Sequence, residues 1–393
     1  MKVPPYNQNK LEQALQAAKS TEPIAFSGMY DSGVDYLFNL AVPLFKAELP
    51  KKITPVFVDL SGLTTEKAIV SELSFILNQT FAGTKSQPNY LDIAAQVKSL
   101  SVKAKIVFVV YLGQEGTVDQ EFFLLLNRLR NLLGWSFSYV LFMTTRVLLN
   151  SKYFDPLLDK VLKRNISLVQ PLDEVNSSVV VDSYEERYRK KLTKPTRKKV
   201  IKLAGGNPGL IKALYLQAAA DSRWKKPDIL DERLFFRLRG IAQDLPEPFV
   251  KTLLNPKGVA SGKNQYLEPL VRYGYLKKYL SNYRSFSPLL EQYFKKHTQS
   301  IPHGSTSPDA DKVVLNFSKS QRRVLKHLKQ NSGKIVTKDN IAQVIWGKNW
   351  EDKYSDWAID QLMHTLREKM ATSQVPGKII TKKGEGVILV TQK

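Results

Sequence analysis

The sequence predicts an α/β, multidomain protein in which a parallel-sheet domain is followed by helices and by two small α+β modules. Short apolar runs alternate with helical segments in the front of the chain. Helical periodicity then takes over, and two later segments end in a strand, a turn and a second strand. Alternation of strands with helices is typical of parallel sheets, whereas helices followed by a hairpin indicate a separate module.

The front domain, residues 1–172, contains five apolar runs of strand length, with amphipathic segments between them. The predicted strands are residues 23–27, 54–60, 105–112, 138–143 and 166–169. The predicted helices are residues 33–49, 65–79, 90–102 and 121–133. Strands that alternate with helices of this length predict a doubly wound parallel sheet with helices on both faces.

Three further segments separate this domain from the end of the chain. Residues 173–228 are predicted to be a helical lid, interrupted by the Gly205–Gly209 segment. Residues 229–299 form a further helical unit with a predicted hairpin at residues 273–286. Residues 300–312 are rich in Ser, Pro and Asp without apolar periodicity, which indicates a flexible linker.

The last segment, residues 313–393, has the pattern of three amphipathic helices and a terminal hairpin. Its third helix presents apolar residues at helical spacing, from Ile359 through Met363 and Leu366 to Met370. Residues 379–390 (IITKKGEGVILV) form two strands around a glycine-bounded turn. This order predicts a winged helix, the helix-turn-helix variant whose last helix enters the major groove. Residues 229–299 show a similar order of helices and hairpin, so two winged helices are expected in the chain.

Several short motifs carry a resemblance to a known family. They are residues 317–318, 331–337, 345–347, 359–360, 366–367 and 381–386. In this order they resemble the DNA-binding domain of OmpR-type response regulators, which implies double-stranded DNA as partner and a role in transcription regulation. The chain departs from the family at Trp357, Lys383 and Val387, where Arg, Arg and an aromatic residue are usual.

Helical geometry limits which side chains of this module reach DNA. The residues opposite the apolar face of the third helix are Trp357, Gln361, His364 and Thr365. The Gln361 amide suits adenine, and Arg367 is expected to reach a phosphate or a carboxylate. The remaining predicted DNA contacts are Thr337 and Lys338 at the start of the second helix and Lys382 and Lys383 in the wing.

The positive charge is concentrated in the back of the chain. The formal net charge is +23, of which residues 1–181 hold +2, residues 182–299 hold +14 and residues 312–393 hold +9. Such asymmetry favours a polyanionic partner. Residues 187–202 alone hold nine basic side chains, for which a phosphate contact and a solvated helix face are equal alternatives. Additional candidate DNA contacts are Lys198, Lys199, Arg272, Lys277 and Arg284.

The loop after the first strand has the glycine spacing of a phosphate-binding loop without its chemistry. Gly28 and Gly33 match the two glycines of GxxxxGK[ST]. Val34 and Asp35 replace the lysine and the hydroxyl that hold phosphate and Mg²⁺. Together with residues 203–211 (LAGGNPGLI), the order of parts resembles the P-loop ATPases of the STAND and archaeal AAA-like groups. The resemblance implies a P-loop-like architecture, and the replacements predict that hydrolysis is lost.

The composition excludes several other classes of function. The chain has no cysteine, its four histidines lack metal-ligand spacing, and no catalytic constellation or membrane span is present. We therefore expect a cytoplasmic, bacterial transcriptional regulator that is not an enzyme and has no metal or required cofactor. One alternative is a switch that binds ATP or ADP without hydrolysis. The other is a pseudo-ATPase scaffold in a defence or mobile-element complex, with self-association or an ATPase or transcription protein as partner.

Overall fold

The computed structural model divides the chain into two compact units, Met1–Ser300 and Ile301–Lys393, which are described separately. The residues that the structure describes are 3–63, 65–80, 89–113, 120–149, 165–221, 224–256, 264–280, 282–298, 319–347, 359, 362–363, 365–367, 370, 377–382 and 385–390. The predicted linker, residues 300–312, lies outside the described residues.

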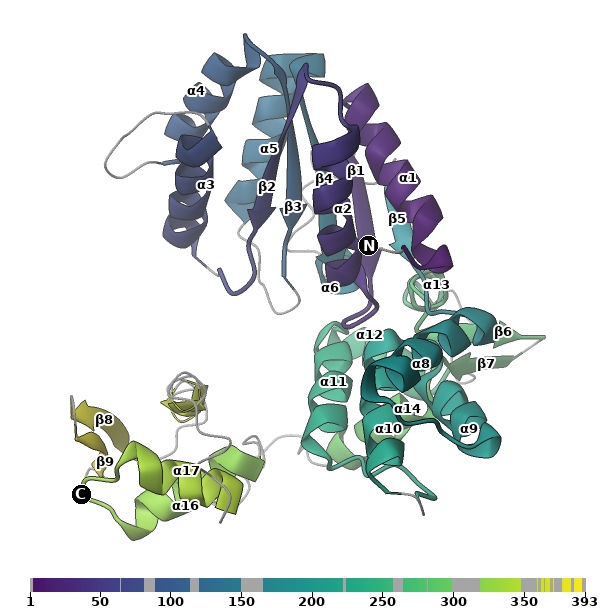
Figure 1. Ribbon diagram of the computed structural model, residues 1–393, viewed down its shortest axis with the longest axis vertical. Coiled ribbons are helices and arrows are strands. Elements are labelled where there is room, and N and C mark those ends of the chain that lie inside the picture. The colour runs from purple at the N-terminus through teal and green to yellow at the C-terminus, as the bar shows by residue number, and fades with distance from the viewer. Residues whose placement is uncertain are drawn as a thin grey trace. The chain divides into compact units, whose positions relative to one another are not determined.

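Five parallel strands form the sheet of the first unit, in the order β2-β3-β4-β1-β5 (Figure 1). They are β1 (Ile24–Gly28), β2 (Ile53–Asp59), β3 (Lys105–Tyr111), β4 (Phe137–Thr144) and β5 (Ile166–Val169). A five-stranded parallel sheet of this kind is typical of P-loop domains. The predicted α/β fold class is confirmed, and all five strands lie within a residue or so of their predicted positions.

Helices cover both faces of this sheet, which explains why its central strands bury apolar side chains on both faces. Along β3, Ile106, Phe108 and Val110 pack into one core, while Val107 and Val109 pack into the other. One face is covered by α1 (Pro5–Ser20) and α2 (Val34–Glu48), and the other by α3 (Glu66–Thr80), α4 (Tyr90–Ser101) and α5 (Gln120–Leu133) (Figure 1). The short η1 (Gly134–Ser136) and α6 (Thr145–Leu149) flank β4. Of these helices, α1 and the short η1 and α6 were not predicted.

The rest of the first unit is a helical assembly with a single core. It comprises α8 (Glu174–Tyr188), α9 (Lys194–Ala204), α10 (Pro208–Ala220), α11 (Glu232–Gln243), α12 (Glu247–Leu254), α13 (Leu267–Arg272), the hairpin β6 (Leu276–Tyr279) and β7 (Asn282–Ser285), and α14 (Pro288–Thr298). Val181, Val200, Leu214, Leu234 and Leu289 are fully buried in one cluster. The predicted lid and the central helices and hairpin therefore pack as one body.

A buried carboxylate joins the loop after β1 to this helical assembly. Asp244, at the end of α11, accepts hydrogen bonds from the backbone amide of Tyr30 (2.8 Å) and from the hydroxyl of Tyr275 (3.3 Å). The Tyr275 hydroxyl lies 2.6 Å from Thr145 Oγ1, just beyond β4. Asn207, the N-cap of α10, donates to the Tyr30 carbonyl (2.9 Å). The backbone amide and the backbone carbonyl of Tyr30 are thus both held by side chains of the helical assembly.

Asp31, the next residue of the loop, is also held by the helical assembly. Asp31 has φ +57°, its carbonyl accepts from the amide of Gly209 (3.2 Å), and its carboxylate pairs with Arg237 (3.2 Å). The loop approaches α10 and α11 so closely that each of these helices needs a glycine at the contact. A Cβ at Gly209 would lie 2.4 Å from Asp31 Cβ, and one at Gly240 would lie 2.5 Å from the ring of Tyr30.

The second unit has the three-helix and hairpin order of a winged helix. Its described elements are α16 (Lys319–Gln330), α17 (Lys338–Trp346), helical residues at 359, 362–363, 365–367 and 370, β8 (Lys378–Lys382) and β9 (Gly386–Val390). The core is formed by residues that include Val324, Leu328, Ile341, Met363 and Leu389. The predicted apolar faces of its helices are confirmed as the buried ones.

A short strand-like contact attaches the hairpin to the helices. The amide of Val336 donates to the Val387 carbonyl (2.8 Å), and the amide of Val387 donates back to Val336 (2.9 Å). Gly386 stands beside this pair with φ +141°, and a Cβ there would lie 2.3 Å from the Val336 carbonyl oxygen. Only glycine permits this approach.

We expect Asp244→Asn to remove a pH dependence of stability from the first unit. Burial raises the pKa of Asp244 to about 7; hydrogen bonds from Tyr30 and Tyr275 and the charge of Arg146 oppose the rise, and Asp31 adds to it. The unfolded chain releases this proton near pH 3.8, so the contribution of Asp244 falls as pH rises from there towards 7. The loss is at most about 4 kcal/mol. Urea unfolding at pH 5, 6.5 and 8 should show the wild type weakening relative to Asp244→Asn, whose amide still accepts from Tyr30. Parallel pH profiles for the two proteins would contradict this account.

We expect Gly386→Ala to destabilise the second unit by about 2–3 kcal/mol, because the new Cβ meets the Val336 carbonyl and φ is unfavourable. Gly333→Ala is the matched control, since Gly333 also has positive φ (+78°) but faces open space. Calorimetry of the full chain should show a lower unfolding temperature for the second unit only. A smaller effect than that of Gly333→Ala would mean that the close approach at Gly386 is unimportant.

Candidate DNA-binding site

The start of α17 presents a hydroxyl, a lysine and backbone amides at the surface. Thr337 is the N-cap, and its Oγ1 accepts from the amide of Asn340 (3.2 Å). Thr337 is exposed and Lys338, the first residue of the helix, is half-buried. The amides at a helix N-terminus attract anions. The structure therefore places both residues where a DNA phosphate contact is chemically suitable, as the sequence predicted.

The third helix turns its apolar stripe inward, as expected. Ile359, Met363, Leu366 and Met370 are at most 3% exposed. Trp357, Gln361 and His364, the predicted outward residues, lie outside the described residues, so their DNA contacts remain predictions.

Thr365 lies on the flank of this helix. Its side chain is half-buried, accepts a hydrogen bond from Gln321 Nε2 of α16 (3.0 Å) and donates to the Leu362 carbonyl (3.0 Å). The hydrogen bond with Gln321 places the Thr365 side chain beside α16. Its role in the structure is to join two helices, and a DNA contact by Thr365 is still only a prediction.

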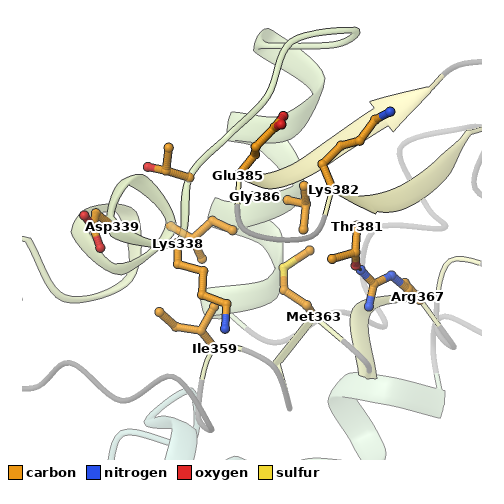
Figure 2. Close-up of a pocket in the computed structure, with 12 residues that line it drawn as sticks. Lys338, Asp339, Ile359, Met363, Arg367, Thr381, Lys382, Glu385 and Gly386 are labelled. Carbon is orange, nitrogen blue, oxygen red and sulfur yellow. The ribbon is translucent and has the colours of Figure 1, made fainter.

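Arg367 connects the third helix to the wing. Its Nε donates to the carbonyl of Ile379 (3.1 Å), and its Nη2 donates to Thr381 Oγ1 (2.5 Å). Figure 2 shows the guanidinium beside Thr381. Within the protein the partners of Arg367 are a carbonyl and a hydroxyl of β8, and its predicted contact with a DNA phosphate stays a prediction. Arg367 thereby fixes the wing relative to the helix that precedes it.

Lys382 is exposed at the end of β8, opposite Gly386 on β9. Its side chain extends away from the domain (Figure 2). Lys383 lies outside the described residues. An exposed cation at the wing tip is suited to the phosphate backbone or a narrow minor groove.

The start of α17, the third helix and the wing enclose a cavity of about 670 Å³ (Figure 2). Its floor is apolar, with Ile341, Met363 and Val387. The charged side chains that line it are Lys338, Arg367, Lys382, Asp339 and Glu385. Residues from the start of α17, the third helix and the wing thus line one concave surface, to which the third helix contributes Arg367 and two residues of its buried stripe, Ile359 and Met363.

The additional candidates in the first unit fall into two groups. Lys198, Arg272 and Arg284 are exposed, and Arg284 lies 5.7 Å from the ring centre of Tyr279. Lys277 is half-buried and donates to the carbonyl of Gly205 (3.4 Å) at the end of α9. Lys277 thus supports the packing of the hairpin against the lid.

Lys199 also has an internal partner. Its Nζ donates to the Lys225 carbonyl and lies 5.8 Å from the ring centre of Trp224. These contacts hold residues 224–225 beside α9.

The loop after β1 lines a second cavity, of about 640 Å³, in the first unit. Tyr6, Tyr36 and Tyr184 form its aromatic wall. Burial, with smaller effects of Tyr36 and Tyr184, raises the pKa of Tyr6 to about 12, so its phenol is neutral. The charged side chains around it are Asp31, Asp35, Glu186, Arg187, Lys212 and Arg237. The lining carries equal numbers of acidic and basic side chains.

These residues do not fit a magnesium-bound nucleoside triphosphate. Val34 is buried at the first position of α2, and Asp35 puts a carboxylate in its first turn. The amide of Tyr30 is donated to Asp244, and the carboxylate of Asp31 lines the cavity. A phosphate loop needs its amides and a lysine directed at the phosphates. Gly28 and Gly33 therefore preserve the shape of such a loop without its ligands.

Sequence reasoning missed Asp244, because nothing near it in the chain marks it as a partner of Tyr30, 214 residues away. Among the described residues, no group of three or more His, Cys, Asp or Glu side chains is placed to hold a metal ion. Within the part of the chain that the structure describes, no helix combines the length and apolar character that a bilayer span requires.

Comparison with solved structures finds similar proteins at low sequence identity. The Walker-type ATPase PABY2304 of Pyrococcus abyssi is 12% identical, over 74% of this chain and 96% of that one, with a TM-score of 0.48. The ORC2 protein of Aeropyrum pernix is 16% identical over 76% and 96% (TM-score 0.46). Cdc6p of Pyrobaculum aerophilum is 13% identical over 100% and 92% (TM-score 0.40). No activity of these proteins is assigned to this chain at such similarity.

Comparison with curated proteins finds no match. Residues 312–389 match the family model described as transcriptional regulatory protein, C terminal. The match spans the helices and the hairpin described above. The C-terminal part of this chain is therefore an OmpR-type winged-helix DNA-binding domain.

Proposed function

We propose that the protein is a transcriptional regulator that recognises a DNA sequence through the third helix of its C-terminal domain. The observation that carries this proposal is the match of residues 312–389 to the OmpR-type domain, together with the predicted phosphate contacts Thr337, Lys338 and Lys382 on the concave surface between the start of α17, the third helix and the wing. Lys338 and Lys382 lie on two sides of that surface.

The two kinds of contact have different roles in this proposal. Thr337, Lys338 and Lys382 bind phosphates and position the domain without reading sequence. Gln361 reads a base, because its amide can donate to and accept from adenine. Arg367 holds the wing against the third helix, so that both contacts keep one geometry.

We further propose that the α/β domain is a non-catalytic sensor or scaffold. Support comes from the position of Val34 and Asp35 and from the hydrogen bond between Tyr30 and Asp244, which uses a loop amide internally. One alternative is a switch controlled by a ligand bound in the cavity beside the loop, such as ATP or ADP held without hydrolysis. Docking of a partner ATPase onto this domain is the scaffold alternative.

We expect Gln361→Ala to change sequence preference, and Lys338→Gln with Lys382→Gln to weaken binding to all duplexes alike. Loss of two phosphate contacts should reduce the slope of log K against log salt by about 2. The control is Lys326→Gln with Lys329→Gln, two exposed lysines of α16 outside the cavity. Fluorescence anisotropy over a salt series, with several duplexes, measures both effects. If Gln361→Ala and the double variant Lys338→Gln with Lys382→Gln weakened binding equally on every duplex, the division of roles would be contradicted.

We expect the protein to release no phosphate from Mg·ATP, because the lysine and hydroxyl of a phosphate loop are replaced. A colorimetric phosphate assay, with an active ATPase as positive control, measures turnover, and titration calorimetry with ATP and ADP measures binding. Turnover that co-purifies with the chain would overturn the non-catalytic proposal. Binding without turnover would instead establish the ligand-controlled switch.

A further inference from the structure

The end of α8 and the whole of α9 carry a concentration of positive charge. Residues 187–202 hold nine basic side chains and no acidic one. Eight of the nine are exposed, and Arg197 is half-buried. The exposed ones are Arg187, Arg189, Lys190, Lys191, Lys194, Lys198, Lys199 and Lys202. We call these eight residues, with Lys225 and Lys226, the lid basic surface.

Arg197 forms salt bridges with two carboxylates of α8. Its Nη1 lies 2.5 Å from Asp182 and 3.4 Å from Glu185, and its Nη2 donates to the Ser178 carbonyl (2.9 Å). Glu185 also accepts from the amide of Leu192 (2.9 Å). Arg197 therefore serves the packing of α8 against α9, and its charge offsets one of these two carboxylates.

Three exposed lysines of α9 follow one another on successive turns of the helix. Lys194, Lys198 and Lys202 are spaced four residues apart, and the row extends over about 12 Å of the helix. Val200, Ile201 and Ala204 on the other side are buried. Among the described residues, none of these three lysines forms a salt bridge. Like charges at this spacing destabilise a helix, and a polyanion bound along the row would relieve that repulsion.

The segment after α10 extends this surface. Lys199 holds residues 224–225 against α9 by its bond to the Lys225 carbonyl and its contact with the Trp224 ring. Lys225 and Lys226 are exposed there. Positive charge from two separate parts of the sequence therefore gathers beside one helix.

We propose that the lid basic surface binds the phosphate backbone of duplex DNA, as a second contact independent of the C-terminal winged helix. Duplex DNA carries about one charge per 1.7 Å, so a row of about 12 Å faces roughly seven phosphate charges. A protein partner fits less well, because the centres of protein interfaces are depleted in lysine. The inference rests on the proposed function in one respect, that the partner is DNA.

Such a second contact has a consequence for affinity. Two DNA-binding surfaces in one chain act on the same duplex at a high effective concentration, so weak phosphate contacts of the lid add to the selectivity of the C-terminal domain. The lid surface supplies no base contacts in this account, and its contribution is salt-dependent and independent of sequence.

The test uses the full chain with Lys194→Gln, Lys198→Gln and Lys202→Gln together. Glutamine removes the charge and retains helix propensity, and the three positions are exposed, so the fold should be kept. The matched control removes the same charge elsewhere, with Lys51→Gln, Lys52→Gln and Lys103→Gln, all exposed on the α/β domain. Circular dichroism and thermal unfolding check both variants.

Anisotropy with a duplex of about 30 base pairs across a salt series gives the decisive readout. The lid variant should lose about tenfold or more in affinity at low salt, and its slope should fall by about 2–3, while the control keeps the wild-type slope. Unchanged binding by the lid variant, or equal losses in variant and control, would overturn the proposal.

A parallel variant separates this inference from the proposed function. Lys338→Gln with Lys382→Gln should weaken binding independently, so that the two losses add in the combined variant. If only the C-terminal variant weakens binding, the lid inference fails and the proposed function stands. If only the lid variant weakens binding, the lid is the DNA contact and the proposed role of the C-terminal domain fails.

Discussion

The hydrogen bond from the Tyr30 amide to the buried Asp244 carboxylate is the interaction on which the first unit depends. It joins the loop after β1 to the end of α11, and through Tyr275 and Thr145 it reaches the end of β4. Asn207 of the lid donates a further hydrogen bond to the Tyr30 carbonyl. Removing an acceptor from such a site would leave a buried amide unpaired, at a cost of about 1–3 kcal/mol. The sheet, the lid and the central helices therefore meet at one loop.

This arrangement gives the loop a role different from that of a phosphate loop with the same glycine spacing. The loop amide faces a side chain of the protein, and Asp31 binds Arg237 and the amide of Gly209. A ligand that enters the adjoining cavity would contact both the loop and the lid, since Asp31, Tyr184 and Lys212 all line it. The proposed sensor role follows from this contact between parts, and it requires no hydrolysis.

The sequence predicted the elements well and their contacts less well. The five strands were found because buried parallel strands are continuous apolar runs, and β4 is buried along its whole length. Helix α1 was missed because it buries mainly small side chains such as Ala14 and Ala18 behind a polar surface. In the candidate site, the inward stripe from Ile359 to Met370 was predictable from periodicity. The partners of Thr365 and Arg367 were not, because they depend on how α16 and β8 pack against the third helix. The hydrogen bond between Asp244 and Tyr30 links residues that are too far apart in the sequence for any local pattern to indicate it.

In the proposed function, the C-terminal domain gives the protein its sequence preference. The most direct measurement is selection from a random duplex pool with the full chain and with a chain that ends at Ser300, the limit of the first compact unit. The account predicts that the full chain enriches a defined motif and that the shortened chain, although it still binds duplex at low salt, enriches none. Enrichment of the same motif by both chains, or of no motif by either, would contradict it.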